Sequence, residues 1–260
     1  MTRNLPKHLL HLAFVCLLST QSLFAQFRSE SGSSKLVLGF GGGYNIATAD
    51  LSGYNFVIDR YNFNRQGAAQ QLAGSSTLAG FTGSLSLYGN MGASGRKFLF
   101  QLQYAERSTP VSSAPDPFIV GGNNNIKTKF RMHNFSFGAG AMPLLSKWID
   151  IGVGASLDAS WVSMMYAAGQ ENLRTLQDQW LWGATAYGMI FVNFGEKAPF
   201  SIGIRPFFQY QFSQADASQL NRVLNPTTFS LDDPAKAKWN VWNAGVEVKF
   251  VITPVKFNYY

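Results

Sequence analysis

The chain has 260 residues, of which 13% are charged and 15% aromatic, and its formal net charge is +7. An ordinary soluble domain carries about 25% charged residues, so this composition indicates a surface that partly faces lipid. We attribute the small positive excess to solvated loops, which gives no reason to expect a nucleic-acid partner.

The N-terminal segment has the layout of a secretory signal peptide. Arg3 and Lys7 precede a short apolar stretch, and Ala25 provides the small residue before the expected cleavage point. An apolar centre of about ten residues is too short for a membrane anchor, which needs about 20. We therefore expect a signal peptide at 1–25 and one mature domain at 26–260.

The mature chain would contain no cysteine, because Cys16 is the only one and lies in this segment. Disulfides, thiolate metal sites and cysteine nucleophiles are thereby excluded. No mature segment reaches about 18 consecutive apolar residues, so membrane-spanning helices are excluded as well. A closed β-barrel then remains as the favoured way for this chain to cross a membrane.

Eight stretches of the mature chain alternate between apolar and polar residues, which is the period-2 pattern of strands with two different faces. In the clearest stretch, Ile149, Ile151 and Val153 share one face, and Asp150 and Gly152 share the other. In a small barrel the apolar face points to lipid. The stretches are 35–49, 76–90, 98–107, 126–141, 149–165, 179–194, 200–212 and 242–252.

The connections between these stretches alternate between long and short. Long polar loops are expected at 50–75, 110–125, 167–178 and 213–237, and short turns at 91–97, 144–148 and 195–199. Outer-membrane barrels have tight periplasmic turns and longer external loops. We therefore predict an all-β, antiparallel up-and-down transmembrane β-barrel of eight strands in the cell outer membrane, with both mature termini periplasmic.

Two features complicate this prediction. Residues 54–61 of the first long loop could form an extra hairpin arm, which makes ten strands the alternative. Three basic residues of the fourth stretch share the parity of its outward apolar residues: Lys127, Lys129 and Arg131. That strand needs either a bulge near His133 and Asn134 or an extension beyond the membrane.

Aromatic residues gather where the strands would leave the hydrocarbon, as in the interfacial girdles of membrane barrels. Near the loop ends they are Tyr44, Tyr104, Trp161, Tyr166, Trp180, Trp182, Tyr210, Phe212, Trp239 and Trp242. Near the turn ends they are Phe98, Trp148, Phe194, Phe200 and Phe250. This placement favours the girdle interpretation over a general preference of aromatic residues for strands.

Catalytic and cofactor chemistry has little support. His133 is the only histidine of the mature chain, and no spacing brings a hydroxyl nucleophile and a carboxylate to it. The glycine-rich run at 39–44 lacks the helix that follows a nucleotide-binding loop, and such glycines let a strand bend. We expect no enzyme activity, no cofactor and no metal site.

Five charged residues lie on faces assigned to the barrel interior: Asp150, Asp158, Arg205, Glu247 and Lys249. Isolated charges are costly in that environment, so we expect them to pair. Eight strands leave an interior just wide enough for side chains to fill. A plugged lumen is expected, and a narrow channel or transporter for small solutes is the alternative.

The long loops are the remaining functional candidates, because loops on a rigid scaffold often contact partners. The candidate contact residues are Tyr54, Arg60, Arg65, Arg222 and Phe229. Mixtures of aromatic and arginine side chains suit contacts with other envelope proteins. The alternative is that these side chains pack over the barrel mouth.

Three segments carry a resemblance to a known group: the end of the signal at 24–26, the glycine-rich first strand at 39–44 and the aromatic tail at 257–260. In these the chain resembles outer-membrane β-barrel proteins of Bacteroidota, including PorT-like members. Pro254 interrupts the last strand and leaves open whether it ends before this residue or resumes after it. The resemblance implies a non-enzymatic structural or protein-interaction component surrounded by outer-membrane lipid, such as an accessory of a secretion or gliding apparatus.

Overall fold

A computed structural model of the chain describes residues 36–65, 70–91, 96–116, 124–145, 148–194, 200–228 and 233–256. The expected signal peptide and the aromatic tail lie outside the described residues. The strands are β1 (Leu36–Ala49), β2 (Thr77–Met91), β3 (Arg96–Ser108), β4 (Ser112–Pro115), β5 (Asn125–Leu145), β6 (Ile149–Ala168), β7 (Arg174–Asn193), β8 (Phe200–Asp216) and β9 (Lys238–Lys256). The helices are α2 (Ser52–Asn64), α3 (Ser218–Leu224) and the 3-10 helix η3 (Pro234–Ala237).

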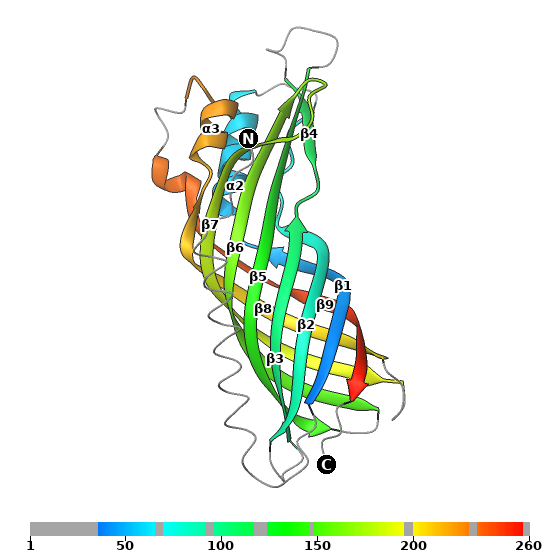
Figure 1. Cartoon of the computed structure of the whole chain (residues 1–260). Coiled ribbons are helices and arrows are strands. Elements are labelled where there is room, and N and C mark those ends of the chain that lie inside the picture. The colour runs from blue at the N-terminus through cyan, green and yellow to red at the C-terminus, as the bar shows by residue number, and fades with distance from the viewer. Residues whose placement is uncertain are drawn as a thin grey trace, which may run out of the picture. The chain divides into compact units, whose positions relative to one another are not determined.

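Eight of these strands form a closed antiparallel ring (Figure 1). Neighbouring strands in the sequence pair with one another, β1 pairs with β9, and β3 pairs with β5, so the ring has no open seam. β4 stays outside the ring and pairs with the start of β5. The predicted eight-stranded up-and-down barrel is confirmed.

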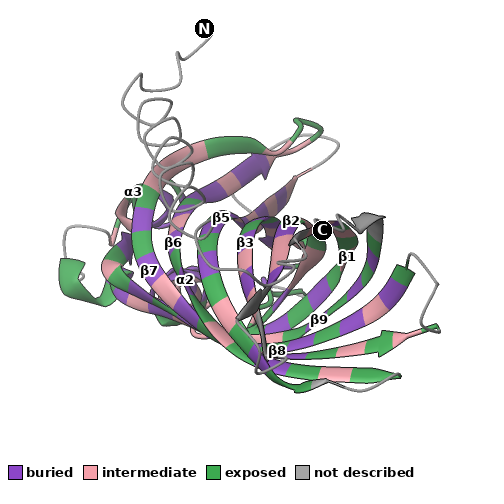
Figure 2. Cartoon of the chain, turned by 60° about the horizontal axis from the view of Figure 1, so that its bottom comes forward, coloured by how far each residue is buried: buried purple, intermediate pink, exposed green. Residues whose placement is uncertain are grey.

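The two faces of the ring differ in polarity, because successive side chains of a strand point to opposite sides. On β8, Ile204, Phe208 and Phe212 are exposed on the outside, whereas Arg205 and Gln209 are buried inside. Figure 2 shows the same alternation of buried and exposed residues along the other strands. The exterior is therefore apolar and the lumen largely polar.

Three strands extend beyond the ring at the loop end. The pairing of β3 with β5 stops at Ser108 and Arg131, whereas β5 continues to pair with β6 as far as Ile126 and Ala168. Of the two expectations for this strand, the structure shows an extension, which runs beyond the ring of strands. The bulge near His133 is wrong, because the register of β5 with β6 shifts only after Ala141.

The first long loop contains a helix, so the hairpin arm that would have made ten strands is wrong. In α2 the side chains of Tyr54, Val57, Ile58 and Tyr61 are buried. They recur at i, i+3, i+4 and i+7, which is one face of a helix. No described helix is long and apolar enough to cross a bilayer.

The last strand resumes after Pro254. Val255 pairs with Leu38 and Ile252 pairs with Phe40, with a register shift between the two pairs. A β-bulge accommodates the proline, which has no N–H to donate to the ladder.

Most of the expected girdle residues face outward, but Trp239 and Tyr166 do not. Trp239 is 5% exposed and Tyr166 is 8% exposed. The Nε1 of Trp239 donates a hydrogen bond to the carbonyl oxygen of Asp50 at 3.0 Å. These two aromatic residues belong to the packing over the barrel mouth, so placing them in the girdle was wrong.

Candidate functional site

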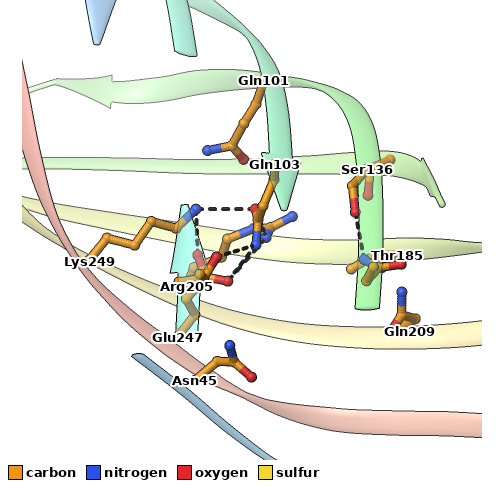
Figure 3. Close-up of polar contacts among 12 residues, drawn as sticks. Asn45, Gln101, Gln103, Ser136, Thr185, Arg205, Gln209, Glu247 and Lys249 are labelled. Atoms are coloured by element: carbon orange, nitrogen blue, oxygen red, sulfur yellow. Dashed lines mark hydrogen bonds and ion pairs between the residues drawn. The ribbon is translucent and has the colours of Figure 1, made fainter. Parts of the chain in front are cut away.

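The centre of the lumen holds a buried charge cluster (Figure 3). The carboxylate of Glu247 accepts a hydrogen bond from Nε2 of Gln103 at 2.6 Å and lies 3.6 Å from Nη1 of Arg205. Its other oxygen contacts Nζ of Lys249. The side-chain oxygen Oε1 of Gln103 accepts hydrogen bonds from Lys249, at 3.1 Å, and from Arg205. Gln103 therefore joins the carboxylate to both cations.

A second buried arginine, Arg107, lies in the same lumen. Its Nε donates to Asn45 at 2.8 Å, and its Nη1 donates to Gln209 at 2.9 Å and to Asn243 at 3.1 Å. Its guanidinium also lies 4.4 Å from the ring centre of Phe207. Amide oxygens and an aromatic face, rather than a carboxylate, satisfy this cation.

Asp158 links to this arginine through a shared glutamine. Oδ2 of Asp158 accepts hydrogen bonds from Thr185 at 2.5 Å and from Nε2 of Gln209 at 2.9 Å. Ser156 donates to Oδ1 at 3.0 Å. Gln209 thus bonds to Arg107 through its oxygen and to Asp158 through its nitrogen, which keeps the two charges connected without direct contact.

The structure brings together Arg205, Glu247 and Lys249 and places Asp158 in the same lumen. Asp150 lies apart, at the turn end of β6, where it accepts a hydrogen bond from Asn193 at 3.3 Å. Arg107 was not among the expected lumen charges. The alternation along its strand, which puts it on the face of the buried Gln101 and Gln103, was the available signal.

A second buried apolar cluster lies among the polar residues of the lumen. Its members Leu99, Met142 and Met189 lie toward the turn end. The rings of Tyr187 and Phe207 instead lie beside the polar network, with their centres 3.8 Å from the guanidinium of Arg205 and 4.4 Å from that of Arg107. A small cavity lined in part by Gln101, Arg205 and Lys249 remains, with room for about one water molecule.

A larger apolar cluster closes the mouth at the loop end. Its members come from α2, α3 and η3 and from eight strands, including Leu78 of β2, Phe130 of β5, Met164 of β6 and Val241 of β9. We call α2, α3, η3, β4 and the ends of β5–β7 beyond the ring the head. The head has a continuous packed apolar interior. Its helices α2 and α3 cover the barrel mouth, and we call these two helices the cap.

Polar contacts fasten the cap to the strands. Arg65 donates to Oδ2 of Asp116 from Nε at 3.1 Å and from Nη2 at 2.9 Å, and it stacks 3.9 Å from the ring centre of Tyr61. The hydroxyl of Tyr54 donates to Thr128 of β5 at 3.0 Å. Burial raises the pKa of Tyr54 to about 12, because the charged phenolate would be desolvated.

Of the five expected contact residues, two are buried in the head, two are at least partly exposed, and one lies outside the described residues. Tyr54 is 1% exposed and the Arg65 side chain is 11% exposed, so both serve the cap and present no surface to a partner. For these two the alternative, packing over the barrel mouth, is what the structure shows. Arg60 is half-buried and Arg222 is exposed on α3. Phe229 lies outside the described residues.

His133 lies on the barrel exterior among aromatic rings. Its Nδ1 is 2.7 Å from the hydroxyl of Tyr104, and its ring centre is 5.7 Å from that of Trp161. These contacts are those of a residue at the girdle. In the described ranges no group of His, Cys, Asp and Glu side chains could hold a metal ion.

No protein-family model and no curated protein sequence matches the chain. Among solved structures, the chain is similar to Neisserial surface protein A, at 8% identity over 85% of this chain and 99% of that one, with a TM-score of 0.43. It is also similar to Ail, the attachment invasion locus protein of Yersinia pestis, solved with the heparin analogue sucrose octasulfate. That match has 8% identity over 84% of this chain and 99% of that one, with a TM-score of 0.35. At this identity the similarity concerns the fold alone.

Proposed function

We propose that the protein is an outer-membrane β-barrel with a non-conducting lumen, whose head presents a surface to another envelope protein. The observation that carries this proposal is the filled interior: an apolar cluster closes the mouth, and a buried polar network together with a second apolar cluster fills the lumen. Because side chains fill the interior of such a barrel, solutes have no open path through it. Its role then depends on the surfaces that the head presents.

The exterior supports a membrane location. Large apolar side chains cover the outside of the ring, and Phe81, Leu157 and Phe212 are 71%, 69% and 61% exposed. Exposing apolar surface to water costs about 25 cal/mol per Å², whereas lipid removes that cost. Together with the expected signal peptide, this exterior favours the outer membrane. β1 begins and β9 ends at the turn end, which supports the proposal that both mature termini are periplasmic.

The head supports an interaction role. Exposed apolar side chains on it include Phe63 at the end of α2, Val111 beside β4 and Val223 on α3, next to Arg222. Exposed apolar residues beside arginine are typical of protein contact surfaces. The resemblance to PorT-like proteins extends the proposal to an accessory of a secretion or gliding apparatus.

Site-specific photo-crosslinking in native outer membranes tests this role. A photoreactive residue would replace Arg222 or Phe63 in the head, and Phe194, exposed at the turn end, would serve as the control position. We expect the head positions to form a crosslink to one defined protein, and we expect the same protein to co-purify with the barrel in mild detergent. Absence of any adduct specific to the head would overturn the interaction role.

The alternative, a channel for small solutes, requires both the cap and the polar network to move. It predicts that substitutions at Asp158 or Arg205 alter solute flux, whereas the interaction role predicts that they alter mainly stability. Flux of small solutes into vesicles containing the wild-type protein would therefore replace our proposal with the channel.

A further inference from the structure

The outer face of β5 changes from apolar to basic as the strand leaves the barrel. Phe137 and Phe135 are 42% and 45% exposed on the exterior. Beyond His133 the same face carries three cations, which alternate with buried residues such as Phe130 and Met132. The cations are Arg131, Lys129 and Lys127, and we call them the basic ladder.

A row of aromatic rings lies directly below the basic ladder. Tyr104 stacks on His133 with ring centres 6.1 Å apart, and His133 contacts Trp161. Trp161 in turn stacks on Trp180 at 6.1 Å. Rings of this kind mark the depth at which a membrane barrel passes from hydrocarbon to lipid headgroups. The ladder therefore begins at headgroup level.

The basic ladder is only partly neutralised by the protein. Arg131 forms an ion pair with Glu106 at 3.5 Å, and Asp178 lies at the level of Arg131 two strands away. Within the described ranges the structure gives no ion pair to Lys127 or Lys129. On the other side of the ring, Lys238 forms an ion pair with Asp216 at 3.9 Å. The protein therefore does supply an anion to another outward cation at this end.

We propose that the basic ladder binds the phosphate groups of anionic lipids in the leaflet that surrounds the loop end of the barrel. Side chains two residues apart on a strand are separated by about 6.6 Å, so one phosphate can lie between two adjacent cations. The lipid chains would then pack on the aromatic row and on Phe135 below. This inference rests on the membrane location under the proposed function.

Lipid retention measured by native mass spectrometry tests the inference. The full-length protein would be placed in lipid nanodiscs of equal parts phosphatidylglycerol and phosphatidylcholine and then released with its bound lipid. Wild-type protein should retain phosphatidylglycerol in preference, by about fivefold for each lysine that contacts a phosphate. K127Q/K129Q should lose most of that preference, and K127R/K129R should keep it.

The matched control is K236Q/K238Q, which removes the same charge from exposed positions in η3 and at the start of β9, across the ring from β5. It should leave the preference unchanged. An equal loss in both glutamine variants would overturn the inference, because net charge alone would then explain the preference. Wild-type protein that enters the discs but shows no preference would overturn this inference alone. Protein that does not enter lipid at all would overturn the proposed function as well.

Discussion

Replacing Glu247 by Gln removes the carboxylate that holds two buried cations. The side chain is fully buried, and it contacts Arg205, Lys249 and Gln103. Removing one partner of a buried ion pair costs about 3–5 kcal/mol, because it leaves an uncompensated charge. In E247Q two cations lose their carboxylate, and the new amide group can turn a donor toward them. We therefore expect the free energy of unfolding to fall by about 3–5 kcal/mol.

Urea unfolding of the barrel in detergent, followed by tryptophan fluorescence, measures this change. The double variant E247Q/K249M removes one of the stranded cations and should recover about 1–2 kcal/mol of the loss. V248A, at the adjacent residue on the lipid face, is the control and should cost about 1 kcal/mol or less. A loss below about 1 kcal/mol in E247Q would refute the reasoning, since the lumen would then be hydrated enough to screen these charges.

Three further changes probe the cap. G53A should destabilise it by about 1–3 kcal/mol in chemical unfolding, although alanine favours a helix by about 1 kcal/mol; the added Cβ would lie 2.1 Å from Cε3 of Trp239. D116N should weaken the pair with Arg65 and increase the rate of proteolysis in the head, with an unchanged rate as the contrary result. Because burial raises the Tyr54 pKa from 10.0 to about 12, the unfolded state loses this proton first. Cap stability should therefore be unaffected below pH 10 and fall between pH 10 and about 12, as followed by near-ultraviolet circular dichroism. Y54F should remove this part of the alkaline loss.

Much of the barrel could be predicted from the sequence, because strands with an apolar outer face and a polar inner face alternate between apolar and polar residues with a period of two. The stretch predicted at 149–165 corresponds to β6, and that at 200–212 corresponds to the first part of β8. Lipid on one side and a polar lumen on the other impose the alternation on every strand. The ends of β6–β8 were predicted too short, since beyond the membrane their residues pack against the helices of the head.

The contents of the loops were harder to predict. α2 carries β-branched and aromatic residues, which also suit a strand, and its i, i+3, i+4, i+7 pattern is brief. Trp239 looked like a girdle residue because its burial depends on α2, which lies far away in the sequence. Contacts across the lumen, such as that between Gln103 and Glu247, depend on barrel closure and leave no local signal.

Single-channel recording of the wild-type protein in planar lipid bilayers tests the central claim most directly. With the mouth capped and the lumen filled, we expect no conductance steps above the lipid baseline. Reproducible steps of the size of a water-filled pore would contradict the closed lumen and, with it, the proposed function.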